Sequence, residues 1–89
     1  MRATWNGTVI AESDKTLVVE GNHYFPPDSV RWDLLAPSPT RTTCSWTGEA
    51  HYWSVEGGND VAWAYPDPLS DARHVTDHVA FWRGVRVEA

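Results

Sequence analysis

The sequence predicts a small, single-domain, mainly β protein with about seven short antiparallel strands and one or two helical turns. Short runs rich in Val, Thr and aromatic residues recur along the 89 residues. Gly, Asn, Asp or Pro separates most runs from the next, as expected between strands of antiparallel sheets. The length suits one hydrophobic core, so we expect residues 1–89 to form a single domain.

The first part of the chain is expected to form three strands. Thr8–Ala11 and Thr16–Glu20 are β-rich runs, and the residues of Glu12–Lys15 between them favour a tight turn, so a hairpin is predicted. A third strand is expected over His23–Phe25. It ends at Pro26 because proline cannot donate to a strand ladder.

The middle of the chain begins less regularly. The segment from Asp28 to Asp33 can form one helical turn with Asp28 as its N-cap, and Ala36–Arg41 has the composition of a proline-rich loop. Two strands are then expected over Ala50–Val55 and Val61–Tyr65. The glycine-containing segment between these two strands predicts a hairpin connection.

The last part is expected to hold a short helix and a closing hairpin. Leu69–Val75 favours a short helix capped by Ser70, because two prolines precede it and prevent strand pairing. Val79–Trp82 and Val85–Glu88 have strand composition. They are expected to pair around a turn at Arg83 and Gly84.

Strand alternation sorts the aromatic side chains of the two middle strands onto faces. Successive side chains of a strand point to opposite sides of the sheet. One face is therefore expected to carry a cluster of rings, and the other face mostly small residues. In the first of these strands Ala50, Tyr52 and Ser54 share one side and His51, Trp53 and Val55 the other, and in the second Val61, Trp63 and Tyr65 lie together.

The charge, the hydropathy pattern and the cysteine count of the sequence exclude several classes of function. The net charge is −5 and the seven basic residues are scattered, whereas nucleic-acid binding requires a clustered basic face. No apolar run approaches the roughly 20 residues of a membrane-spanning helix. The N-terminus has no apolar signal region, and the single cysteine cannot form an internal disulfide, so we expect a protein of the reducing cytoplasm.

The residues also carry a family resemblance that extends over nearly the whole chain. The chain resembles the small bacterial family catalogued as domain of unknown function 427 (DUF427), which is also labelled a nucleotidyltransferase family. The resemblance implies a β-tent-like fold, in which antiparallel sheets meet at an angle, as in methionine sulfoxide reductase B and cereblon. The matching residues are Trp5-Asn6-Gly7, Val9-Ile10-Ala11, Val19 to Asn22, Tyr24-Phe25-Pro26, Cys44, Trp46, Gly48, Ala50, Tyr52, Ala62-Trp63, Tyr65-Pro66, Val79-Ala80-Phe81 and Gly84-Val85.

The sequence departs from the chemistry of these relatives. Zinc-bearing β-tent proteins hold their metal with two Cys-x-x-Cys pairs, and one cysteine cannot provide such a site. The chain also has no glycine-rich phosphate loop ending in Lys-Ser or Lys-Thr, and no Asp-x-Asp pair for magnesium. The nucleotidyltransferase label therefore has no support in the motifs, and neither a metal nor a cofactor is expected.

Two patterns offer low-ranking candidates for chemistry. Cys44 is the only thiol, and His51 is its nearest base in the sequence, but free cysteines are commonly buried as small hydrophobic residues. His74 and His78 have the spacing of two ligands on one helix face. The strand expected directly after His78 would end that helix first, so these residues are interpreted as surface histidines.

The aromatic residues give the stronger functional hypothesis. Trp46, Tyr52, Trp63 and Tyr65 lie in the segments that carry the family resemblance, and rings around an open concavity can hold planar groups or cations. We therefore expect a module that binds a small neutral or cationic ligand, or a modified peptide. The alternatives are a thiol-dependent enzyme acting through Cys44, and a structural or dimerisation domain with a Trp-rich core. The chain is expected to be a monomer or homodimer, without nucleic-acid or membrane partners.

Overall fold

The computed structural model describes residues 1–89, apart from the side chain of Asp71. The described chain consists of antiparallel strands and short 3₁₀ turns, which confirms the mainly β fold class. The strands are β1 (Arg2–Trp5), β2 (Thr8–Glu12), β3 (Leu17–Val19), β4 (Asn22–Tyr24), β5 (Ala36–Cys44), β6 (Gly48–Val55), β7 (Gly58–Ala64), β8 (Val79–Phe81) and β9 (Arg86–Glu88). The 3₁₀ turns are η1 (Pro27–Ser29), η2 (Trp32–Leu34) and η3 (Ser70–Val75).

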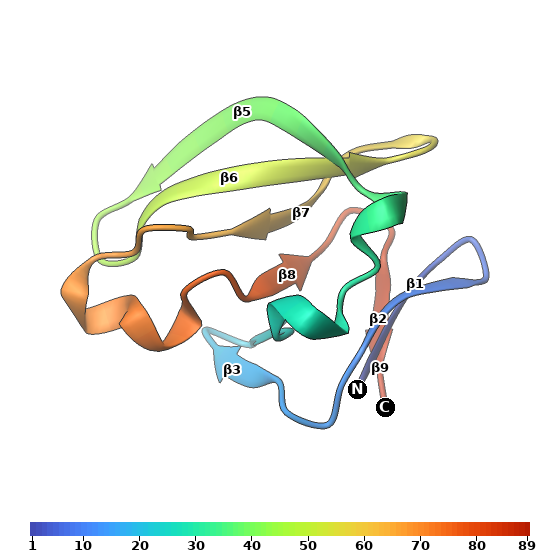
Figure 1. Cartoon of the computed structure of the whole chain (residues 1–89), viewed down its shortest axis with the longest axis horizontal. Coiled ribbons are helices and arrows are strands. Elements are labelled where there is room, and N and C mark those ends of the chain that lie inside the picture. Colours follow the sequence, from blue (N-terminus) through green and yellow to red (C-terminus); the bar gives the residue numbers. More distant parts are fainter.

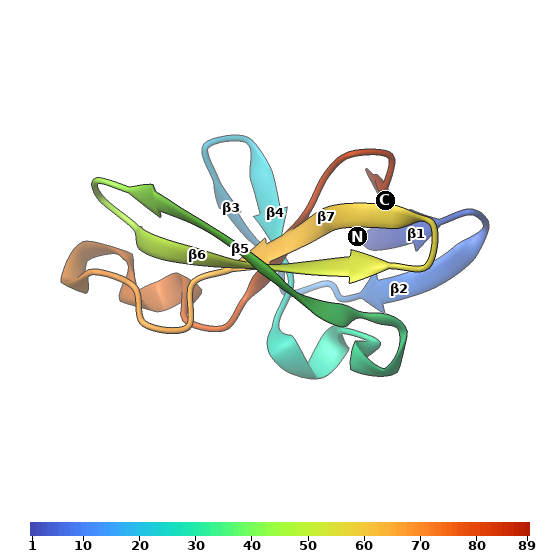
Figure 2. The same ribbon diagram turned by 90° about the horizontal axis from the view of Figure 1, so that it is seen from above.

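The strands form three sheets that meet at an angle (Figure 1). One sheet has the strand order β2-β1-β9, the second is the β3-β4 hairpin, and the third has the order β5-β6-β7-β8. Seen from above, the β3-β4 hairpin stands away from the other two sheets as a separate unit (Figure 2). It joins the four-stranded sheet where Phe25 and Val79 exchange backbone hydrogen bonds of 2.8 and 2.9 Å.

Two predicted hairpins are wrong, because both pairs of strands belong to different sheets. β2 pairs with β1 and not with β3, and β9 pairs with β1 and not with β8. The β1-β2 turn is formed by Asn6 and Gly7, whose φ angles of 48° and 84° are those of a tight hairpin turn. That local signal outweighs the turn composition of Glu12–Lys15, which instead leads the chain from one sheet to the next.

The proline-rich segment predicted as a loop is the first half of strand β5. Pro37 and Pro39 are tolerated there because β5 lies at the edge of its sheet and pairs with β6 alone. The register with β6 shifts between Ser38 and Arg41, as at a β-bulge.

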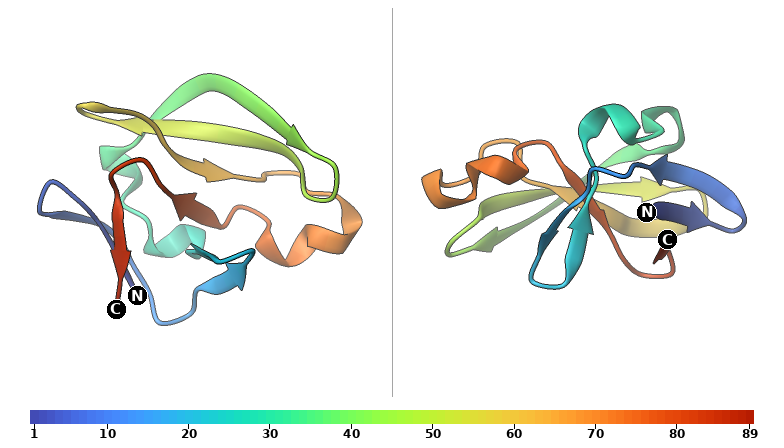
Figure 3. Two further views of the ribbon diagram at one scale, coloured as in Figure 1. Left: turned by 180° about the vertical axis from the view of Figure 1, so that it is seen from behind. Right: turned by 90° about the horizontal axis from the view of Figure 1, so that it is seen from below.

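The predicted helical segments are 3₁₀ turns, and neither predicted cap is present. Asp28 lies inside η1, which follows Pro26, and no side chain caps this turn. The turn η3 follows Leu69 and also lacks a side-chain cap, so Ser70 is its first residue and not its cap. It lies at the end of the molecule away from the β1-β2 hairpin (Figure 3).

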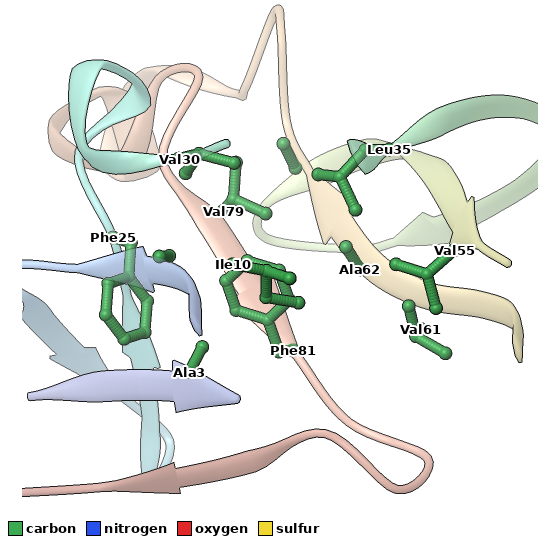
Figure 4. Close-up of a cluster of buried hydrophobic side chains, with 12 residues drawn as sticks. Ala3, Ile10, Phe25, Val30, Leu35, Val55, Val61, Ala62, Val79 and Phe81 are labelled. Atoms are coloured by element: carbon green, nitrogen blue, oxygen red, sulfur yellow. The ribbon is translucent and has the colours of Figure 1, made fainter. Parts of the chain in front are cut away.

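Two clusters of buried side chains hold the sheets together. The first fills the space between the three-stranded and four-stranded sheets, with Phe25, Val79 and Phe81 among its members (Figure 4). The rings of Phe25 and Phe81 meet edge to face at 5.5 Å. The second cluster lies between the β3-β4 hairpin, η3 and the four-stranded sheet, and it is rich in tyrosine. This second cluster forms the floor of the candidate site.

Candidate functional site

A hollow of about 200 Å³ opens between the β3-β4 hairpin and the four-stranded sheet. Five of its lining residues are aromatic and one carries a carboxylate. We call this hollow the aromatic pocket. Its lining consists of Glu20, Asn22, Tyr24, Tyr52, Trp63, Tyr65 and Trp82.

The register of the four-stranded sheet brings the rings to one face. Tyr52 of β6 lies opposite Trp63 of β7, and Trp63 lies opposite Ala80 of β8. Ala80 is small and completely buried, so it leaves room beside the indole of Trp63. Trp82 follows two residues later and packs against Trp63, with ring centroids 5.2 Å apart.

The β3-β4 hairpin supplies the opposite wall through Tyr24. Its ring meets the indole of Trp63 edge to face at 6.1 Å, and the indole Nε1–H donates to the Tyr24 hydroxyl at 3.2 Å. Tyr65 lies 6.5 Å from Tyr24. Tyr52 lies 6.5 Å from Trp82, and its hydroxyl is hydrogen bonded to the Thr42 hydroxyl at 2.8 Å. These contacts fix the five rings relative to one another.

Glu20 places a carboxylate at the rim of the pocket from an uncommon backbone conformation. Glu20 and Gly21 form the β3-β4 turn with φ angles of 52° and 80°. A positive φ is ordinary for glycine, but it is uncommon for glutamate. The side chain is held by Trp46, whose Nε1–H donates to the Glu20 carboxylate at 2.9 Å.

Three of the four predicted binding residues therefore lie together in the pocket, and one does not. Tyr52, Trp63 and Tyr65 line it, whereas Trp46 is outside the lining and reaches it through Glu20. Val61 was predicted on the same face, but it packs in the first core cluster. The register irregularity between Trp53 and Val55, opposite the start of β7, accounts for this change of side.

The whole chain matches the model of a known protein family. A family model described as Domain of unknown function (DUF427) matches residues 1–89. The chain belongs to this family. A search of curated proteins found no match to the DUF427 chain. The family description names no activity, so an argument about function must come from the residues of the site.

The structure does not bring Cys44 and His51 of the DUF427 chain together as a dyad. Cys44 pairs with Gly48 across the β5-β6 hairpin, whereas His51 pairs with Arg41. The His51 ring nitrogen Nε2 contacts the Glu49 carboxylate at 3.1 Å. The pKa of Cys44 is nonetheless lowered, chiefly by the hydrogen bond of the Thr47 side chain and further by backbone N–H groups of Trp46 and Thr47.

We predict that Thr47→Val slows alkylation of Cys44 near neutral pH. The change keeps the shape of the buried side chain but removes the hydroxyl that stabilises the thiolate, so the pKa of Cys44 will rise toward its ordinary value. The rate of iodoacetamide modification, measured against pH, will show its midpoint at higher pH in the variant. Thr43→Val on the exposed side of β5 is the control, and equal midpoints in all three proteins would refute the assignment.

The histidines of the DUF427 chain do not form a shared site. The turn η3 ends at Val75, so His74 and His78 do not lie on one helix. Among the described side chains, no group of three or more His, Cys, Asp and Glu is placed to hold a metal ion. The described chain likewise contains no helix with the length and apolar character needed to cross a membrane.

The buried phenol of Tyr24 makes the fold sensitive to high pH. Burial raises the pKa of Tyr24 to about 12, and the N–H of Trp63 offsets only part of this effect. The unfolded chain loses the same proton near pH ~10. The stability from this group is therefore fully present below about pH 10 and is lost as the pH rises through about 12.

Urea unfolding at a series of alkaline pH values will measure this loss. In Tyr24→Phe, which has no proton to release, the decline in the free energy of unfolding between about pH 10 and pH 12 will be shallower. At neutral pH the same variant will be slightly less stable, because the Trp63 N–H loses its acceptor. Parallel declines in both proteins would show that Tyr24 does not carry the effect.

Proposed function

We propose that this DUF427 domain binds a small ligand carrying a protonated amine in the aromatic pocket. The observation that carries this proposal is the convergence of five aromatic rings and the Glu20 carboxylate around one hollow of about 200 Å³. A cation over an aromatic face gains about 0.5–2 kcal/mol per contact, with the larger values at desolvated sites. A carboxylate beside the rings adds charge-assisted hydrogen bonds to the N–H groups.

The electrostatics of the chain support a cation over an anion. The net charge of −5 raises the local concentration of positive ligands around the protein. Glu20 is the charged residue of the described lining, and no lysine or arginine belongs to that lining. A phosphate-bearing ligand would therefore be repelled by Glu20, and the lining itself offers it no cation.

One ring of the pocket already accepts a cation within the chain. The guanidinium carbon of Arg83 lies 4.5 Å from the centroid of the Trp82 ring. Trp82 is 39% exposed, which is high for a tryptophan, and it contacts both Trp63 and Tyr52. A ring in this position can contribute to the recognition of a positive group from solvent.

A hollow larger than the aromatic pocket is present, but a larger volume alone does not make it a better binding site. A hollow of about 380 Å³ lies beside the β1-β2 hairpin, but Trp5 is its one aromatic wall in the described lining. The indole N–H of Trp5 donates to the Glu56 carbonyl at 3.1 Å and is therefore already used. Binding sites are distinguished by converging polar and aromatic groups as well as by volume, and on that basis we assign the function to the aromatic pocket.

Tryptophan fluorescence tests the proposal, because Trp63 and Trp82 line the pocket. We expect pentylamine to change the emission saturably at pH 7, and the neutral analogue pentanol to change it far less. Glu20→Gln keeps the acceptor for Trp46 but removes the charge, so it will weaken pentylamine binding about tenfold. Glu88→Gln, on exposed strand β9, is the matched control and will bind as the wild type does.

The same experiment can refute the proposal. Saturable binding of pentanol as tight as that of pentylamine would assign the pocket to neutral ligands. A peptide containing methylated lysine presents the same cationic chemistry, and its binding would support the site while changing the source of the ligand. The absence of any saturable change, with both variants correctly folded by circular dichroism, would remove the basis for a cation site.

A further inference from the structure

A second hollow lies on the same face of the four-stranded sheet. It has a volume of about 350 Å³ and is bordered by hydroxyl groups, prolines and one carboxylate. We call it the hydroxyl pocket. Its lining consists of Pro37, Ser38, Pro39, Thr40, Ser54, Asn59 and Asp60. It differs from the aromatic pocket in having no aromatic residue in the described lining.

The linings of the two pockets have no residue in common, but they contain neighbouring positions of the same strands. Ser54 follows Tyr52 by two positions on β6, so their side chains point to the same side of the sheet about 7 Å apart. Ser38 lies directly opposite Tyr52 in the register of β5 and β6. Trp82 connects the two sites, because its ring packs near Tyr52 and its Nε1–H donates to the Asp60 carbonyl at 2.6 Å.

Asp60 supplies the carboxylate of the hydroxyl pocket, and hydrogen bonds hold this residue in place. The Thr40 hydroxyl donates to its carboxylate at 2.7 Å, and its backbone N–H donates to the Ser54 hydroxyl at 3.0 Å. Hydrogen bonds from Ser38 and Thr40 lower the pKa of Asp60, so its carboxylate stays ionised in mildly acidic solution. Its φ angle of 53° shows that the surrounding contacts hold it in an uncommon conformation.

We infer that the ligand of this domain is a linear aliphatic diamine whose two ammonium groups occupy the two pockets. One ammonium binds among the rings beside Glu20, and the other binds beside Asp60. The alkyl chain between them crosses the exposed face of Trp82, which is suited to methylene groups. This inference rests on the function proposed above, and it adds a second charge to the ligand.

The Arg83 guanidinium competes with the second ammonium group of the ligand for contacts with the protein. The guanidinium lies over Trp82 and also contributes to the lowered pKa of Asp60, so it is near both groups that the second ammonium would contact. A diamine must displace or share this position. Removing the guanidinium frees Trp82 as well as Asp60, so it is expected to strengthen diamine binding more than monoamine binding.

Calorimetric titration with pentylamine and cadaverine tests the inference, since these probes differ only in the second ammonium. Wild-type protein will bind cadaverine about tenfold more tightly than pentylamine. Asp60→Asn will reduce cadaverine binding to the level of pentylamine and leave pentylamine unchanged. Arg83→Asn will tighten cadaverine binding more than pentylamine binding, and asparagine suits the φ of 54° at this position.

The outcomes separate this inference from the proposed function. Equal binding of pentylamine and cadaverine, unaffected by Asp60→Asn, would overturn the diamine and leave the amine site standing. Binding of aminopentanol as tight as that of cadaverine would show that the second group needs no charge, which also overturns the diamine. Failure of both amines to bind would overturn the proposed function itself.

Discussion

Replacing Phe25 with alanine will lower the free energy of unfolding by about 3–5 kcal/mol, the usual cost of removing a buried aromatic ring. The side chain of Phe25 is completely buried, and its ring packs edge to face on Phe81. Such a loss is a large part of the roughly 5–15 kcal/mol that stabilises a typical domain. The backbone of Phe25 also ties the β3-β4 hairpin to β8, so loosening this position will affect the wall that carries Tyr24.

Equilibrium unfolding in urea will measure the effect. Phe25→Leu keeps most of the apolar volume and will cost about 1.5 kcal/mol or less. Val18→Ala removes an apolar side chain that is 60% exposed, and it will cost about 0.5 kcal/mol or less. A Phe25→Ala protein as stable as the Val18→Ala control would contradict the packing described for this ring.

Gly58→Ala will destabilise the protein by about 1–3 kcal/mol, the usual cost of overpacking a filled site. A Cβ atom at this position would lie 2.7 and 2.8 Å from two atoms of the Trp5 indole and 3.0 Å from a methyl of Val61. Trp5 cannot move away without breaking the bond from its Nε1–H to the Glu56 carbonyl. The glycine thus lets the β6-β7 hairpin lie directly against the tryptophan of β1.

A double-mutant cycle with Trp5→Phe will show that the clash is the cause. The smaller ring lacks the indole atoms that the new Cβ would meet, so Gly58→Ala will cost much less in that background. Gly7→Ala is a useful comparison, because a Cβ there meets nothing within 4 Å and the cost comes from its φ of 84° alone. Additive effects of the Trp5 and Gly58 changes would refute the contact.

The parts of the fold that depend on local patterns could be predicted from the sequence. The alternation of β6 placed Tyr52 on the face of the second core cluster and Trp53 against the first. The glycine-containing turn between β6 and β7 was likewise predicted as a hairpin connection, and the two strands pair across it. These features need only neighbouring residues, and their physical causes act over one strand and one turn.

The rest of the fold depends on contacts between distant parts of the chain. Strands β1 and β9 pair from opposite ends of the sequence, which no local composition indicates. Pro37 and Pro39 suggested a loop, because the edge position that tolerates them is a property of the whole sheet.

The set of pocket residues predicted from the sequence was incomplete for the same reason. Tyr24 and Trp82 join the pocket from β4 and from the end of β8, which lie far from β6 and β7 in sequence. One signal for Trp82 was present, since it lies two positions after Ala80 and alternation places both on one face. For Glu20, the signal was a glutamate directly before the glycine of a two-residue turn, where asparagine or aspartate is usual.

At position 20, the residue that would best stabilise the fold differs from the residue that the proposed site requires. At a φ of 52°, asparagine or glycine would relieve the backbone and strengthen the β3-β4 turn. Either substitution would also delete the acidic group of the described pocket lining. A library of variants selected only for heat resistance should therefore drift away from glutamate at this position, whereas one selected for amine binding should retain it.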